Sequence, residues 1–191
     1  MHPTSLPAPL LGLIDARGLR DRTCLIGVDG LGAAGKSTLA ARLATEIGGV
    51  VASTDDLSAP GSDPWEIDRF IAEIWTPLSQ GRPARYRVHH WTRAEPGQWV
   101  DLPANIPVVL EGVRSTARAN PAPFDLRIWV DADLPTRLAR AEARDPGRFS
   151  CWTTNWMPIE QAWFAAERPD LVADHVVRQT AIGPWPGGRS D

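Results

Sequence analysis

Lysine is almost missing from this chain: Lys36 is the only lysine among 20 basic residues, and the other 19 are arginines. Where arginine has taken every other basic position, the remaining lysine is expected at a place that needs a compact ammonium group in a tight space. The same scarcity excludes GTPases that select guanine with an N-K-x-D motif, because no second lysine exists to supply it.

Cysteine and long apolar runs are also scarce. Cys24 and Cys151 are the two cysteines, and Cys24 lies in an apolar run typical of a buried strand, which favours free thiols over a disulfide. No stretch approaches 18 apolar residues, so no membrane-spanning helix is predicted. Residues 1–19 lack a basic segment, and the apolar run 10–14 is too short for a secretion signal. We therefore expect a cytoplasmic protein.

Neither sign of charge dominates. The 20 basic and 23 acidic residues give a net charge of −3, which argues against a protein that coats nucleic acid or an anionic membrane. With 16 glycines and 18 prolines, the chain is also not of low complexity. A length of 191 residues predicts one domain, residues 1–191, that is large enough to bury a core without disulfides.

Short apolar runs alternate with helical patterns along the chain. This alternation predicts an α/β fold of the P-loop NTPase type, with three α/β/α layers, a mainly parallel five-stranded sheet and a small lid. The segment 84–100 is interpreted as an exposed hairpin or edge element, and breaks are expected at Pro77 and at 146–147. Strands are predicted at 24–28, 50–54, 106–110, 126–130 and 175–177, and helices at 36–47, 65–74, 134–145 and 156–167.

The segment from Gly30 to Ser37, Gly-Leu-Gly-Ala-Ala-Gly-Lys-Ser, matches the pattern G-x-x-x-x-G-K-[ST]. An apolar strand precedes it and an amphipathic helix follows it, as a phosphate loop requires. Small residues let successive backbone amides turn inward around an anion, and the helix N-terminus adds positive charge. Lys36 is expected to contact the β- and γ-phosphates of ATP, and the Ser37 hydroxyl to bind Mg²⁺. The predicted nucleotide-binding residues are Gly30, Gly32, Ala33, Ala34, Gly35, Lys36, Ser37 and Thr38.

The order of further segments carries a family resemblance. The phosphate loop within 27–38, Thr-Asp-Asp-Leu at 54–57, Val-Val-Leu-Glu-Gly at 108–112 and the segment 129–145 resemble the uridine kinase-like group of P-loop nucleoside kinases. Phosphoribulokinases and pantothenate kinases share much of this pattern, which covers roughly residues 20 to 180. The resemblance implies transfer of the γ-phosphate of ATP to a hydroxyl of a small molecule, first of all a nucleoside. Another metabolite (a sugar, a vitamin precursor or an antibiotic) and a nucleotide-dependent regulatory ATPase remain alternatives.

The resemblance also assigns roles to acidic residues at the ends of strands. Asp55 matches the aspartate that accepts the proton of the substrate hydroxyl, and a carboxylate at this end of a parallel strand opens into the ligand crevice. Asp56 is the alternative base. Glu111 resembles the Walker B position that holds Mg²⁺ through water or assists the base. For each carboxylate the alternative is a turn or cap, which is the favoured interpretation of Asp131.

A lid is expected at about residues 137–158. Arg140, Arg144 and Arg148 are spaced four apart, and in the resembling family lid arginines here clamp the transferred phosphate. Arg140 and Arg144 are therefore catalytic candidates together with Asp55 and Lys36. The alternative is a solvated helix face with ion pairs to acidic neighbours.

The acceptor is expected to bind the segment from about 55 to 100. The candidate substrate-binding residues are Asp55, Asp56, Tyr86, His90 and Arg93. For the aromatic members the alternative is ordinary packing in a hairpin, and Trp152, Trp156 and Trp163 are likewise interpreted mainly as packing residues of the core and lid. The expected partners are ATP and a small-molecule acceptor, and the chain is expected to be a monomer or a homodimer.

Overall fold

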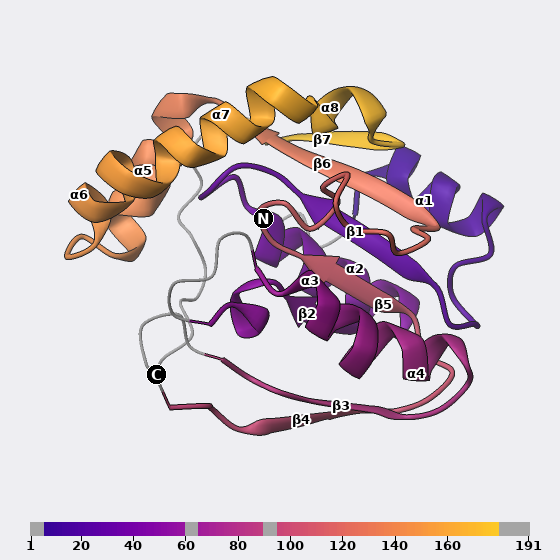
Figure 1. Ribbon diagram of the computed structural model, residues 1–191. Helices are drawn as coiled ribbons and strands as arrows, with labels where there is room; N and C mark the ends of the chain where they lie inside the picture. The colour runs from indigo at the N-terminus through magenta and orange to yellow at the C-terminus, as the bar shows by residue number, and fades with distance from the viewer. Residues whose placement is uncertain (1–5, 60–64, 90–94, 180–191) are drawn as a thin grey trace.

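A computed structural model of the 191-residue chain describes residues 6–59, 65–89 and 95–179. Its centre is a parallel five-stranded sheet, with flanking helices that make an α/β fold (Figure 1). The predicted fold class is thereby confirmed. The strands lie in the order β2 (Val50–Ser53), β5 (Val108–Glu111), β1 (Leu25–Asp29), β6 (Leu126–Ala132) and β7 (His175–Gln179).

Strand β1 lies in the middle of the sheet and leads directly into the phosphate loop. It pairs with β5 on one side and β6 on the other, and all five of its residues are buried. A parallel strand that is covered on both faces has a nearly continuous apolar sequence, and for this reason the strand could be predicted from the sequence. The carboxyl ends of β1, β2 and β5 therefore share one edge of the sheet.

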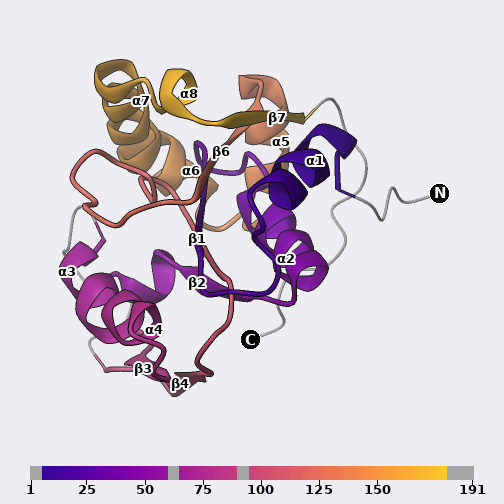
Figure 2. The ribbon, with the colours of Figure 1, turned by 90° about the vertical axis from the view of Figure 1, so that its right-hand side faces the viewer.

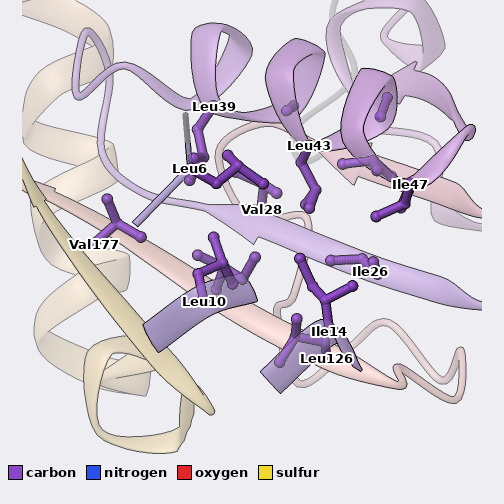
Figure 3. Close-up of a cluster of buried hydrophobic side chains, with 14 of the residues drawn as sticks. Leu6, Leu10, Ile14, Ile26, Val28, Leu39, Leu43, Ile47, Leu126 and Val177 are labelled. Atoms are coloured by element: carbon purple, nitrogen blue, oxygen red, sulfur yellow. The ribbon is translucent and has the colours of Figure 1, made fainter. Parts of the chain in front are cut away.

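Helices α1 (Ala8–Ala16) and α2 (Lys36–Ile47) cover one face of the sheet (Figure 2). The helical stripe expected on α2 faces the sheet, as Figure 3 shows for Leu39, Leu43 and Ile47. Helix α1 was not predicted. It has only nine residues and no side-chain cap, so isolated helix formation would be marginal, and burial of its apolar side against the same core stabilises it.

The opposite face carries a helix and a hairpin, β3 (Ala84–Arg87) with β4 (Trp99–Leu102). The expected hairpin is confirmed. The helix consists of α3 (Ile67–Arg69), the π-helical segment η2 (Phe70–Trp75) and α4 (Thr76–Ser79), so the predicted stop before Pro77 is wrong. A wider π turn ahead of a proline relieves the clash between its ring and the preceding turn, and the helix continues.

Two further helices lie near the carboxyl edge of the sheet. Helix α5 (Leu134–Arg144) ends before the expected break at 146–147, where the chain turns back. The second helix begins at Phe149, earlier than predicted, and Pro158 again follows a π-helical segment. Its parts are α6 (Phe149–Cys151), η3 (Trp152–Trp156) and α7 (Met157–Glu167), and α8 (Pro169–Val172) follows.

Aromatic packing joins α7 to the sheet. Phe164 stacks on Trp129 of β6 with ring centroids 5.3 Å apart, and Trp163 packs beside them, as expected for a core tryptophan. The same helix also reaches the phosphate loop, through Glu160.

Both cysteines are free, as predicted. Cys24 is buried, its Sγ donates to the carbonyl of Leu19, and burial raises the pKa of its thiol to about 11. Cys151 is exposed. Within the described ranges, none of the helices is long and apolar enough to cross a membrane.

Candidate functional site

The loop between β1 and α2 has the backbone of an anion nest. Gly30, Ala33 and Gly35 have positive φ angles of 156°, 61° and 106°, which turn successive peptides around a common centre. A Cβ at Gly30 would lie 2.5 Å from the carbonyl oxygen of Val130, so only glycine fits there. Gly35 is the N-cap of α2, and the helix N-terminus adds its partial positive charge at the same place.

Lys36 lies in the tight place that its scarcity predicted. The residue is only 8% exposed, lines the main cavity, and its ammonium group donates to the carbonyl of Leu31 at 3.1 Å. Its charge acts to lower the pKa of two buried carboxyl groups, those of Asp29 and Glu111. A bound phosphate would find this charge already desolvated and oriented.

The structure brings Ser37 and Glu111 together. The Ser37 hydroxyl donates to Glu111 Oε2 at 3.1 Å, and the hydroxyl of Ser53 donates to the other carboxylate oxygen at 2.9 Å. Burial raises the pKa of Glu111, while the charge of Lys36 opposes this shift and that of Asp55 adds to it. Hard oxygen ligands beside a phosphate loop suit Mg²⁺, which prefers few protein ligands and completes its shell with phosphate and water. The residues present therefore fit this metal.

A cavity of about 480 Å³ opens beside the loop. The phosphate loop, the ends of β2 and β5, and the helices from α5 to α7 all contribute to its wall. Trp152 and Trp156 line it, so the interpretation of these two tryptophans as packing residues is incomplete. The remaining aromatic and large apolar residues of the wall are Trp65, Phe149 and Ile159.

Asp55 faces this cavity and begins the 3-10 turn η1 (Asp55–Leu57) directly after β2. Its backbone N–H donates to the Ser53 hydroxyl at 3.3 Å. The negative charge of its carboxylate also acts to raise the pKa of Glu111. Asp56 is absent from the cavity wall, and its backbone carbonyl accepts the N–H of His89 at 2.8 Å. This arrangement favours Asp55 over Asp56 as the residue that meets a ligand.

The three arginines expected in the lid approach the site in different ways. Arg140 donates to the carbonyl of Ala34 at 3.0 Å, and with Arg144 it lines a second, smaller cavity of about 40 Å³ against the phosphate loop. Arg144 and Arg148 both line the main cavity, although Arg148 lies beyond the end of α5. Their contact with a phosphate stays a prediction.

Of the other expected acceptor residues, the structure describes only Tyr86, which is not part of the cavity wall. Tyr86 is 2% exposed and belongs to the apolar cluster beneath the hairpin, which favours ordinary aromatic packing. His90 and Arg93 lie outside the described residues.

Sequence reasoning missed Asp29, the last residue of β1. Its carboxylate accepts hydrogen bonds from the backbone N–H groups of Gly30 (2.7 Å), Arg114 (3.0 Å) and Thr116 (2.9 Å), and from the Thr116 hydroxyl (2.8 Å). It thus joins the start of the phosphate loop to the loop that places Arg114 on the cavity wall. The sequence held one signal for this role, because Asp29 is a carboxylate at the end of an otherwise apolar strand.

Titration of Asp29 should make stability depend on pH. Burial raises the pKa of its carboxyl to about 6 from 3.8, against the opposing effect of its hydrogen bonds. Between about pH 4 and 6 the folded chain keeps a proton that the unfolded chain releases, so the free energy of unfolding falls as pH rises through this window, by about 3 kcal/mol for this group.

Urea unfolding of the wild type and of Asp29→Asn at several pH values measures this effect. The variant lacks the titrating group, so the stability difference, wild type minus variant, should decrease by about 3 kcal/mol between pH 4 and 7. A difference that stays constant with pH would show that Asp29 titrates alike in both states.

Comparison with solved structures agrees with this fold. The chain superposes with a TM-score of 0.62 on a candidate uridine kinase from Bacillus stearothermophilus, at 16% identity, covering 88% of this chain and 98% of the other. A candidate fructose transport system kinase from Silicibacter sp. TM1040 gives a TM-score of 0.59 at 17% identity, covering 91% and 100%. No protein-family model and no curated protein matches the sequence. At such identities the likeness defines the class of fold, that of P-loop kinase structures.

Proposed function

We propose that this protein is an ATP-dependent kinase that transfers the γ-phosphate to a hydroxyl of a small molecule. One observation carries the proposal: the phosphate loop with Lys36, the Ser37–Glu111 pair and the carboxylate of Asp55 line one cavity. A phosphate donor site, oxygen ligands for Mg²⁺ and a base are the parts that phosphoryl transfer needs.

The chain's own residues would divide the chemistry as follows. The loop amides and the Lys36 ammonium bind and orient the β- and γ-phosphates. Ser37 would hold Mg²⁺ directly and Glu111 through water, and the metal supplies positive charge to the phosphate oxygens when bound. Asp55 accepts the proton of the acceptor hydroxyl. Arg140 and Arg144 neutralise the charge that develops on the transferred group.

The wall of the cavity combines aromatic and charged residues. Trp65 and Trp156 are aromatic members of the wall, and Asp55, Arg114 and Arg148 are charged members. A nucleoside has a flat ring and several hydroxyls and would match such a wall. A sugar is the second candidate, supported by the fold shared with the candidate fructose transport system kinase.

An ADP-release assay against nucleosides, sugars and other small metabolites, with and without Mg²⁺, tests this proposal. We expect ADP release that requires both Mg²⁺ and one class of acceptor, and that is lower by at least about 10²-fold with Lys36→Ala. ATP hydrolysis that proceeds at the same rate without any acceptor would instead support the regulatory ATPase. Absence of nucleotide binding would refute the kinase assignment.

A further inference from the structure

Two side chains from distant helices hold the backbone of Gly32 in the phosphate loop. The Gly32 N–H donates to Glu160 Oε2 at 2.7 Å, and the Gly32 carbonyl accepts from Arg137 Nε at 2.8 Å. Glu160 belongs to α7 and Arg137 to α5. Both peptide units that flank Gly32 are therefore fixed from outside the loop.

Arg137, Trp152 and Glu160 form one connected group, here called the Gly32 clamp. Trp152 Nε1 donates to Glu160 Oε1 at 3.2 Å, and Arg137 Nη2 lies 3.6 Å from Glu160 Oε2. Arg137 is 3% exposed and Glu160 8% exposed. A buried ion pair of this kind adds little to stability, because two charges lose their hydration, although removing one partner leaves the other charge buried and unpaired.

The contact leaves no room for a side chain at position 32. A Cβ on Gly32 would lie 2.8 Å from Trp152 Nε1 and 2.9 Å from Glu160 Oε1, distances that a real side chain does not tolerate. The φ angle of Gly32 is not in the left-handed region, so the clamp, and not the local backbone, requires glycine at this position.

The clamp sits next to the strained part of the loop. Ala33 follows Gly32 and has a φ of 61°, a conformation that persists only where the surroundings hold it. Arg137 holds the peptide before Ala33 through the Gly32 carbonyl, and Arg140 holds the next stretch through the carbonyl of Ala34. Hydrogen bonds from α5 thus flank the strained residue on both sides.

We propose that Glu160 and Arg137 are positioning residues that hold the phosphate loop, through Gly32, in the form that binds phosphate. The proposal rests on the proposed function. The contact keeps Ala33 in its left-handed conformation and the amides after it turned toward the nucleotide, so the loop is organised before the ligand arrives. Because α5 and α7 both take part, their docking on the loop and nucleotide binding support each other.

The test is the dissociation constant of ATP with Mg²⁺, measured by isothermal titration calorimetry on the full chain. Glu160→Ala removes the acceptor for the Gly32 N–H and leaves Arg137 unpaired, so we expect binding to weaken about tenfold. Glu160→Gln keeps one oxygen for the Gly32 N–H but loses the charge, so we expect a loss of about threefold. Gln161→Ala, an exposed neighbour on α7, is the matched control and should bind like the wild type.

A positioning role also predicts which kinetic constant changes. In the ADP-release assay Glu160→Ala should raise the KM for ATP about tenfold and leave the KM for the acceptor within twofold, whereas unfolding of part of the protein would lower the apparent turnover and leave both KM values unchanged. If Glu160→Ala does not fold, Glu160→Gln decides: weaker ATP binding supports the proposal and wild-type binding overturns it.

Other outcomes separate this proposal from the proposed function. Unchanged or tighter ATP binding by Glu160→Ala, in a protein whose wild type binds ATP, overturns the positioning role and leaves the kinase assignment standing; tighter binding would identify Glu160 as a competitor for the loop amide. Failure of the wild type to bind ATP overturns the proposed function and this inference with it.

Discussion

Asp55→Asn is expected to lower turnover by about 10²- to 10⁴-fold and to leave ATP affinity nearly unchanged. Asparagine has almost the same shape but cannot accept the proton of the acceptor hydroxyl. Asp55 lines the cavity beside Glu111 and takes no part in the phosphate loop's own hydrogen bonds, so the nucleotide site should survive the change. Single-turnover kinetics with a saturating acceptor, together with calorimetry for ATP, measure both quantities.

Asp56→Asn is the matched comparison, because Asp56 is the adjacent carboxylate and does not line the cavity. We expect its turnover to stay within a few-fold of the wild type. If Asp56→Asn lost activity and Asp55→Asn kept it, the base would be Asp56 and the assignment of Asp55 would be wrong.

Lys36→Ala is expected to weaken ATP binding about tenfold and to lower turnover by at least about 10²-fold, because one charge serves both bound phosphate and the developing transition state. The ammonium group is buried in the wall of the site, so its removal takes away a charge that already faces the cavity. Fluorescence titration with an ATP analogue gives the first quantity, and the ADP-release rate gives the second.

Lys36→Arg is the informative companion, since arginine has replaced lysine everywhere else in this chain. A guanidinium is wider than an ammonium group, and Lys36 is only 8% exposed, so we expect little recovery of turnover. Full activity of either variant would refute the assignment of Lys36 to the transferred phosphate.

Much of the fold could be predicted because its signals are local. Strand β1, the loop after it and helix α2 are adjacent in sequence, and their apolar run, small residues and four-residue stripe each have a direct physical cause. The scarcity of lysine marked Lys36 in the same way. Ser37 and Glu111 also lie together because the ends of neighbouring parallel strands share one edge.

The ends of helices were harder to predict where tertiary packing overrides the local conformational preference of the residues. Pro77 and Pro158 both lie inside helices because π-helical segments precede them, and no single-residue rule predicts that adjustment. Helix α1 has weak intrinsic signals and forms against the core that Leu10 and Ile14 help to fill.

The amino-acid sequence by itself determined the phosphate loop, the parallel sheet that carries it and the carboxylates at the strand ends, since these follow from neighbours in the chain. Only the tertiary structure decided that Asp29 joins this loop to residues 114–116, that Glu160 meets the Gly32 N–H, and that Trp152 and Trp156 line a cavity. These contacts join residues some 85 to 128 positions apart. Hydrogen bonds between residues so far apart in sequence depend on how the helices dock on the sheet. The periodicity of the sequence shows which side of an element is apolar, but it does not show where that side docks.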